Sequence, residues 1–469
     1  MVYEMIVEYG LYLTLGIGVI VPLVSMIVGR TSRIVAYLAW LGVISFAAST
    51  VALAIATSKS GSITFYGGLV SHDGFTTLIL LGLALTASIA ALAAGREPLL
   101  WESSPGFYSL LPLALFGSFF IVGANDALVV LASWLLVSVI SYVVVALPSD
   151  KESRAAAVRY ILVGAVATFF IAIWAASNTV SAAESGQQGF TVAGLTLDTA
   201  GALAFAALLA GLGFKLGVVP FHWWLPSVYG KANGLVVSIV SGVVKLAFIG
   251  LFARLIYLNA GTNLAVSTTM AIVLAVLAVA TMTYGNIAAL TAPGFKRVLA
   301  YSSIAHVGYI LAGAAALAYA APVDPGVAKI ALAGIAVQAI AYGISKSALF
   351  PIAEEAGDNP ALAGQGRLPS SSTAVLLLSL LGMPPLLGFW GKLYLFIAAA
   401  SYSIILVAVA LINSAISSAY YVRLAREAVS SEGAHEIPDR TIIAVIIAAA
   451  ATILLGIIAP LAISSITLP

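Results

Sequence analysis

The chain has 469 residues, of which 62% are hydrophobic and only 8% are charged, whereas soluble domains carry about 25% charged residues. A net charge of +2 is too small to indicate a nucleic-acid-binding protein. Cysteine is absent, which excludes disulfides, iron–sulfur clusters and thiolate metal sites, so we expect no cofactor in this chain.

Long apolar stretches follow one another along the sequence. A transmembrane helix needs about 20 mostly apolar residues, and these runs lack the alternation of transmembrane barrel strands. We therefore predict an all-α integral membrane protein with about 14 transmembrane helices. The predicted spans are residues 5–28, 34–57, 74–94, 107–123, 127–147, 156–176, 199–219, 234–258, 265–290, 298–320, 327–350, 373–399, 402–424 and 440–466.

Basic residues are distributed unequally between the loops. Thirteen lysines and arginines lie in loops after odd-numbered spans, against two, Lys59 and Lys329, after even-numbered spans. Cytoplasmic loops carry the excess of basic residues. We therefore expect a plasma-membrane protein with both termini on the outer side.

Two spans contain helix-breaking residues. These are Gly211, Gly213, Gly217 and Pro220 in the seventh span, and Gly382, Pro384, Pro385 and Gly388 in the twelfth. Interrupted helices at matching places in two halves are typical of transporters built from inverted repeats. We predict two inverted five-helix repeats, spans 4–8 and 9–13, with broken helices 7 and 12. The segments are then a three-helix part at 1–104, a core at 105–425, and a last loop and helix at 426–469.

Four lysines lie inside apolar stretches: Lys215, Lys245, Lys346 and Lys392. A charged side chain at the bilayer centre costs roughly 2.5–3.5 kcal/mol on insertion scales, and such residues mark ion or proton pathways. A buried ammonium group also loses its charge readily, as a proton relay requires. Snorkelling to the interface is the alternative; it is an equal alternative for Lys346, near the end of its span. For Arg254 we expect the side chain to extend outward.

Two histidines, His222 and His306, lie near the spans. Imidazole gains and loses a proton near neutral pH, so either could pass protons, although a structural role is the more common one. No histidines and carboxylates have the spacing of metal ligands, so we predict no metal site.

Three segments carry a family resemblance: PFHWWLP (220–226), KRVLAYSSIAHVGY (296–309) and GMPPLLGFWGKLYLF (382–396). They resemble signatures of the antiporter-like membrane subunits of respiratory complex I and of the related Mrp-type cation/proton antiporters. The similarity covers roughly 105–425. Lys392 after the broken helix is most similar to subunit N of NADH–quinone oxidoreductase. The stretch YGISKSALF (342–350) is instead similar to the subunit M and Mrp-type branches, with Tyr342 in the place of a histidine.

The resemblance implies roles for the lysines. Lys215 matches the central lysine of the seventh helix, Lys245 the lysine of the eighth, and Lys392 the residue that leads to the exit. In this family protons would come from the cytoplasm, sit on Lys245, pass along a hydrated line and leave by way of Lys392. A carboxylate and adjacent subunits would set the charge of Lys215.

The family pattern for that carboxylate is a glutamate on span five. Here Leu135 stands in its place, within Leu135–Ser138. The nearest substitute is Asp126, nine residues earlier, which is about 13 Å along a helix. At that separation two charges couple much less than a contact pair.

Three functions therefore remain open. The first is a proton-translocating, non-redox subunit of a complex I-like translocase, which would work with other membrane-arm subunits. The quinone, flavin and iron–sulfur clusters would lie only in partner subunits. The second is a subunit of a Mrp-type sodium/proton antiporter. The third is a transport-inactive structural subunit, which the replacement of the glutamate by Leu135 favours.

Overall fold

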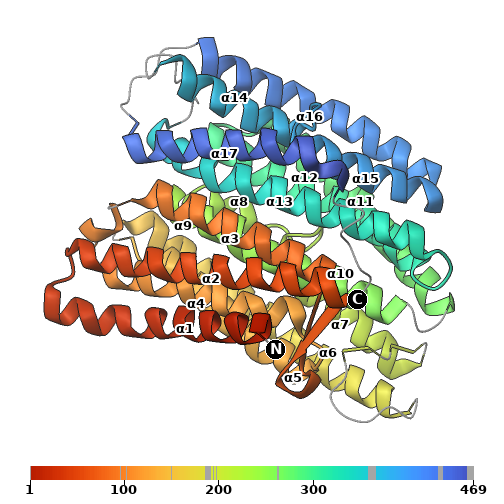
Figure 1. Cartoon of the computed structure of the whole chain (residues 1–469). Helices are drawn as coiled ribbons and strands as arrows, with labels where there is room; N and C mark the ends of the chain where they lie inside the picture. Colours follow the sequence, from red (N-terminus) through yellow and green to blue (C-terminus); the bar gives the residue numbers. More distant parts are fainter. Residues whose placement is uncertain are drawn as a thin grey trace.

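In a computed structural model the chain forms a bundle of long helices that lie side by side (Figure 1). The structure describes residues 2–461 except 96, 102, 149, 185–191, 194, 197, 261–263, 358–365 and 431–436. The helices are α1 (Val2–Val28), α2 (Arg33–Ser60), α3 (Gly74–Ala94), α4 (Ser104–Gly123), α5 (Ala127–Ala146), α6 (Lys151–Glu184), α7 (Thr199–Leu216), α8 (Trp224–Tyr229), α9 (Gly234–Ser238), α10 (Lys245–Ala260), α11 (Leu264–Thr291), α12 (Phe295–Ala320), α13 (Pro325–Glu355), α14 (Arg367–Leu381), α15 (Leu387–Tyr402), α16 (Ile404–Ser430) and α17 (Asp439–Ile458).

Thirteen helices of the described residues are long and apolar enough to cross a membrane. One of them, Gly234–Ala260, joins α9 and α10 through a π-helical turn, η3 (Ile239–Val244). The predicted span 373–399 is not among them, because it coincides with α14 and α15, which have only 15 and 16 residues. Thirteen helices of the described residues therefore meet this criterion, against the prediction of about 14 with helices 7 and 12 broken. The chain is a multi-pass membrane protein.

A small hairpin between α2 and α3 departs from the predicted all-α fold. Strand β1 (Ser62–Phe65) pairs antiparallel with β2 (Val70–Asp73), with Ser62 opposite Asp73. The hairpin follows the end of α2 (Figure 1). Four-residue strands in a segment between two long apolar runs give no periodic signal that could have predicted them.

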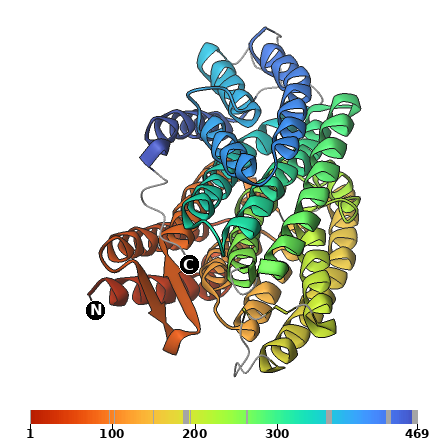
Figure 2. The same cartoon turned by 90° about the vertical axis from the view of Figure 1, so that its right-hand side faces the viewer.

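The core of the bundle is formed by the continuous helix 234–260, α12 and α13, whose side chains are almost all buried. Outer helices expose large apolar side chains, such as Met26 and Ile27 on α1, which are 82% and 85% exposed. Figure 2 shows the N-terminal helices (red to orange), the middle helices (yellow to green) and the C-terminal helices (blue) as neighbouring groups. The apolar exterior fits a lipid environment, and the core is available for polar chemistry.

Two helices end abruptly next to a buried lysine. α7 ends at Leu216 with Gly217 in the left-handed region (φ 80°), and α14 ends at Leu381 with Gly382 at φ 93°. In α7 the N–H groups of residues 217 and 218 both donate to the carbonyl of Gly213, and in α14 those of 382 and 383 both donate to Leu378. The two ends therefore share one hydrogen-bond pattern, which glycine permits because it lacks a β-carbon.

Candidate functional site

Lys215 lies in the last turn of α7 and is 6% exposed. Its Nζ donates to Ser141 Oγ of α5 at 3.3 Å. Three rings surround the ammonium group, with their centres at 4.8 Å (Tyr142), 5.2 Å (Tyr160) and 4.8 Å (Phe248). Aromatic faces stabilise a desolvated cation, so this pocket can hold the charged form without a carboxylate.

Lys245 is the first residue after the π-helical turn and is 3% exposed. Its Nζ donates to the carbonyl of Ser303 on α12 at 3.3 Å and lies 5.5 Å from the ring centre of Tyr342 on α13. Ser241, within the π-helical turn, lies 2.6 Å from the hydroxyl of Tyr342. Such turns recur at functional sites because they redirect side chains and free backbone groups.

Lys346 lies on α13 and is fully buried. Its Nζ donates to the carbonyl of Leu299 at 2.7 Å and to Ser302 Oγ at 2.6 Å, both on α12. The rings of Tyr342 and Phe350 are both 5.7 Å from the nitrogen. The structure therefore holds Lys346 inside the protein, not at the interface. Lys245 and Lys346 both lie against the ring of Tyr342.

His306 of α12 connects this pair to the next group of polar side chains. It is 2% exposed, and its ring centre lies 5.6 Å from that of Tyr342. Gln338 Nε2 lies 3.0 Å from His306 Nδ1, and His306 Nε2 lies 3.0 Å from the hydroxyl of Tyr421. With Nδ1 accepting from the amide, the proton of the neutral ring is on Nε2 and points toward Tyr421.

Lys392 lies on α15 and is 4% exposed. Its Nζ donates to the carbonyl of Leu381 at 2.6 Å and to Ser414 Oγ of α16 at 3.2 Å. The ring centre of Tyr309 is 4.7 Å away. Leu381 is the last residue of α14, so its carbonyl has no helical partner, and the end of the helix supplies an acceptor for the buried ammonium group.

Side-chain hydrogen bonds lie between His306 and Lys392. The hydroxyl of Tyr420 donates to Asn286 Oδ1 at 2.9 Å, and Asn286 Nδ2 lies 3.0 Å from the hydroxyl of Tyr309 and 3.2 Å from Asn413 Oδ1. The ring of Tyr420 is 4.5 Å from that of Tyr421. A buried polar network thus extends from Ser241 toward Lys392. Amides orient such a network but do not carry protons, so water must complete any proton path.

No carboxylate forms an ion pair with any of the four lysines among the residues that the structure describes. Within the same residues, no three His, Asp or Glu side chains gather as a metal site would require. The four lysines therefore lie among hydroxyls, amides, aromatic rings and the imidazole of His306, and within the described residues their positive charge has no carboxylate partner.

Two predicted site residues lie elsewhere. The ring of His222, in the turn between α7 and α8, packs against Tyr284 of α11, with the centres 4.1 Å apart. Asp126 caps α5, where its Oδ1 accepts from the N–H groups of Leu128 at 2.8 Å and Val129 at 3.2 Å. Helix capping accounts for this carboxylate.

Leu135 lies on α5, about two helical turns before the residues that meet Lys215. It is 43% exposed, whereas the residues of α5 that meet Lys215 are Ser141 and Tyr142. The neighbouring Trp134 is fully buried and packs edge-on against Phe248, one of the rings around Lys215. Leu135 precedes Tyr142 by seven residues, so the two side chains lie on nearly the same face of α5, about 10 Å apart along the helix.

Arg254 is buried, so the expectation that it extends outward is wrong. It is 2% exposed, and its guanidinium donates to Asp73 Oδ2 at 2.8 Å and to Asn125 Oδ1 at 2.6 Å. Asp73 also caps α3. Beside this pair, His72 is fully buried, and neither of its ring nitrogens has a hydrogen-bond partner among the described residues. Burial and the nearby guanidinium hold the pKa of His72 well below its usual range.

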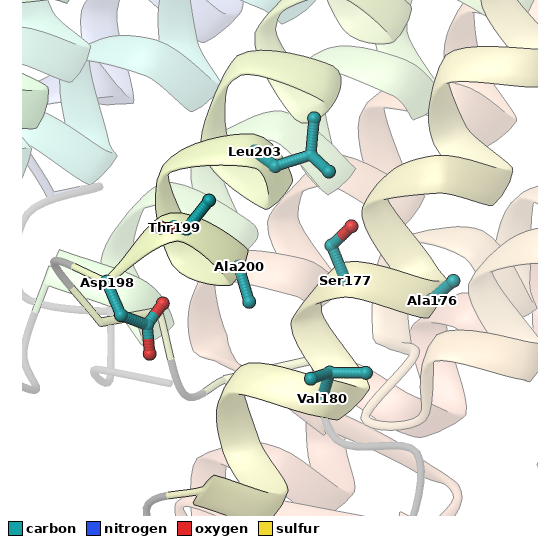
Figure 3. Close-up of a pocket in the computed structure, with 7 residues that line it drawn as sticks. All are labelled: Ala176, Ser177, Val180, Asp198, Thr199, Ala200 and Leu203. Atoms are coloured by element: carbon teal, nitrogen blue, oxygen red, sulfur yellow. The ribbon is translucent and has the colours of Figure 1, made fainter.

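A large pocket lies away from the lysines, between the C-terminal part of α6 and the first turns of α7 (Figure 3). It has a volume of about 490 Å³. Its single acidic residue, Asp198, caps α7 by accepting from Gly201 N at 2.6 Å. The remaining lining is small or apolar.

The fold and this interior define a multi-pass helical membrane protein that keeps ionisable side chains inside the bundle. Residues 124–417 match the family described as NADH:quinone oxidoreductase/Mrp antiporter, TM. The chain belongs to this family, which confirms the resemblance predicted from 220–226, 296–309 and 382–396.

Individual relatives agree with the family assignment. The chain is 33% identical over 405 residues to NADH-quinone oxidoreductase subunit N 2 of Sorangium cellulosum, covering 79% of this chain and 78% of the relative. A chain of respiratory complex I from Thermus thermophilus is 25% identical with a TM-score of 0.79, covering 97% of this chain and 98% of that one. A chain of the Mrp complex from Dietzia sp. DQ12-45-1b has a TM-score of 0.84 at 19% identity, covering 99% and 96%, which shows the shared fold.

Proposed function

We propose that the chain is a proton-translocating membrane-arm subunit of a complex I-like respiratory oxidoreductase. The observation that carries the proposal is the buried polar network that links Lys245 and Lys346 to Lys392 in a bundle with an apolar exterior. Relatives named as subunit N of NADH-quinone oxidoreductase support the choice of complex.

Lys245 and Lys346 are the proposed loading site for the proton. Both nitrogens lie against the ring of Tyr342, at 5.5 Å and 5.7 Å, without a carboxylate partner among the described residues. Two positive charges in such a site disfavour each other. A proton that arrives on one lysine therefore favours the neutral form of the other, and the pair holds one transferable proton.

Gln338 controls whether His306 can accept that proton. In the structure Gln338 Nε2 points at His306 Nδ1, while Gln338 Oε1 has no hydrogen-bond partner among the described residues. Protonation of Nδ1 would require an acceptor in place of the amide N–H. A rotation of the amide by half a turn supplies that acceptor, and the imidazole can then pass its other proton toward Tyr421.

Lys392 is the proposed group on the outward side of this path. Its hydrogen bonds to Leu381 and Ser414 hold the ammonium group at the end of α14. Both acceptors are neutral, so the lysine can release its proton without leaving an uncompensated carboxylate behind. Water would receive the proton.

The architecture that we propose for this function is a pair of inverted repeats, spans 4–8 and 9–13. The pair of hydrogen bonds that the ends of α7 and α14 share, to Gly213 and to Leu378, supports it. The core would occupy 105–425, between a three-helix part at 1–104 and a last loop and helix at 426–469. The distribution of basic residues supports termini on the outer side of the plasma membrane.

The redox chemistry belongs, in this proposal, to partner subunits. The chain has no cysteine, so it cannot ligate an iron–sulfur cluster through thiolates. Flavin, quinone and iron–sulfur centres would lie in other chains, and this subunit would take part in the translocase without a redox centre.

The experiment that tests the function is the replacement Lys245→Ala in the assembled complex. Lys151→Ala, at an exposed position in the first turn of α6, is the matched control. Protons moved per electron are measured in sealed vesicles together with the rate of electron transfer. The proposal predicts a lower ratio for Lys245→Ala than for Lys151→Ala; equal ratios at equal assembly would refute it.

A second candidate function is a subunit of a Mrp-type sodium/proton antiporter. The buried position of Lys346, within the segment 342–350 that is similar to the Mrp-type branch, favours it. Antiport predicts sodium-dependent proton movement without an electron donor, whereas the first function predicts none. The transport-inactive alternative rests on the replacement of the span-five glutamate by Leu135.

A further inference from the structure

Three core helices are joined at one end by a single carboxylate. Glu354, in the last turn of α13, accepts through Oε2 from the backbone N–H of Gly234 at 2.8 Å and from Lys296 Nζ. Gly234 begins α9, and Lys296 lies in the first turn of α12. The joined helices carry Lys346, Lys245 (through α10) and His306. The loops at this end follow odd-numbered spans, so the basic residues place it on the cytoplasmic side.

The helices approach one another closely at this point. A β-carbon on Gly234 would collide with the carbonyl oxygen of Phe350 and with the side chain of Glu354. The carboxylate is nevertheless accessible, because Glu354 is 33% exposed and Lys296 is 16% exposed. An accessible acid therefore lies at the end of a tightly closed helix junction.

A polar pocket of about 390 Å³ opens at the same place. Its lining includes Lys296, Arg297 and Glu354. Glu354 is the only acidic side chain of its lining, so it is the group of this pocket that can both accept and donate a proton.

Glu354, Phe350 and Lys346 lie in one row along α13. They are spaced four residues apart, so they share one face of the helix. Phe350 is fully buried, with its ring centre 5.7 Å from Lys346 Nζ and 5.7 Å from the ring of Tyr229 on α8. The apolar ring therefore stands between the pocket and the buried lysine.

We propose that Glu354 is the acid through which protons reach Lys346 from the cytoplasmic side, with the ion pair to Lys296 and the ring of Phe350 keeping this inlet closed. This inference rests on the proposed function. In the transfer step the O–H bond of the protonated Glu354 breaks and a new N–H bond forms on neutral Lys346 through intervening water, which regenerates the carboxylate. The carboxylate then pairs again with Lys296.

The position of the inlet is tested by chemical access, independently of pumping. Because the chain has no cysteine, Lys346→Cys introduces the only thiol of this subunit. A membrane-impermeant thiol reagent is added to the cytoplasmic side of vesicles that contain the assembled complex. Labelling of this subunit should be at least tenfold faster when Phe350→Ala is added. Ile352→Ala, a buried aliphatic position of the same helix, is the matched control for loss of packing. Equal labelling rates for the two double variants at equal assembly would overturn the inlet.

The role of the acid is tested by Glu354→Gln. The amide oxygen of glutamine can still accept from Gly234, so the contact between α13 and α9 is kept, while proton exchange and the ion pair to Lys296 are lost. We expect at least a threefold lower ratio of protons to electrons, with electron transfer intact and recovery in Glu354→Asp. A wild-type ratio of protons to electrons, with a wild-type dependence of that ratio on pH, would overturn the role of Glu354 in proton transfer. If Lys245→Ala leaves pumping unchanged, the proposed function itself fails, while the labelling rates still decide whether the inlet exists.

Discussion

The replacement Arg254→Met tests the buried ion pair between Arg254 and Asp73. Asp73 is 1% exposed, and its Oδ2 lies 2.8 Å from the guanidinium. Methionine keeps much of the length of the side chain but leaves the carboxylate unpaired in the protein interior. Removing one partner of a buried pair costs about 3–5 kcal/mol, or about two to four powers of ten in the ratio of folded to unfolded protein.

The measurement is the denaturation midpoint of the solubilised complex. It is made for the single variants Arg254→Met and Asp73→Asn and for the double variant Asp73→Asn/Arg254→Met. The double variant should be more stable than Arg254→Met, because it contains no unpaired charge. Arg423→Met is the control: Arg423 is 44% exposed and lies 4.0 Å from Glu427, an arrangement worth less than about 1 kcal/mol. If Arg254→Met were as stable as Arg423→Met, the energetic importance of the buried pair would be refuted.

Three further outcomes are expected. The pKa of His72 is lowered in the folded protein, so as the pH falls the unfolded chain binds a proton at this residue first. The contribution of His72 to stability is then complete above about pH 6.5, and below it stability falls by up to about 1.4 kcal/mol per pH unit. The variant His72→Leu should lack this slope in thermal unfolding at pH 5 to 8. Leu135→Glu should leave the protons moved per electron unchanged, because the rings around Lys215 already stabilise its charged form without a carboxylate; increased pumping would contradict that reasoning. Tyr421→Phe removes the hydrogen bond to His306, so we expect slower pumping and a loss of stability of about 0.5–1.5 kcal/mol. Unchanged pumping would exclude the hydroxyl of Tyr421 from the proton path.

Local sequence signals were sufficient for most of the fold. Thirteen predicted spans coincide with helices because about 20 apolar residues in a row have few structural alternatives. The pairing of Arg254 with Asp73 could not be predicted in the same way. The two residues are 181 positions apart, and hydropathy alone favours an outward path for an arginine near the end of a span.

The lysines of the site could be predicted individually, but their surroundings could not. Depth within an apolar run identified Lys245 and Lys392 as buried. Sequence reasoning missed Asn286, Gln338 and Asn413, although polar amides inside apolar spans are the signal that could have found them. Asp126 was considered as a substitute for the span-five glutamate, but its carboxylate caps α5. Its position in the sequence did not reveal this capping role.

The central claim, that protons move through a hydrated line of buried lysines, is tested most directly by a density map of the assembled complex that resolves ordered water. The account predicts water molecules that bridge Lys346, His306, Tyr421 and Lys392, with the lysine side chains held inside the bundle. A dry interior between His306 and Lys392 would contradict it, as would lysine side chains that extend to the lipid headgroups.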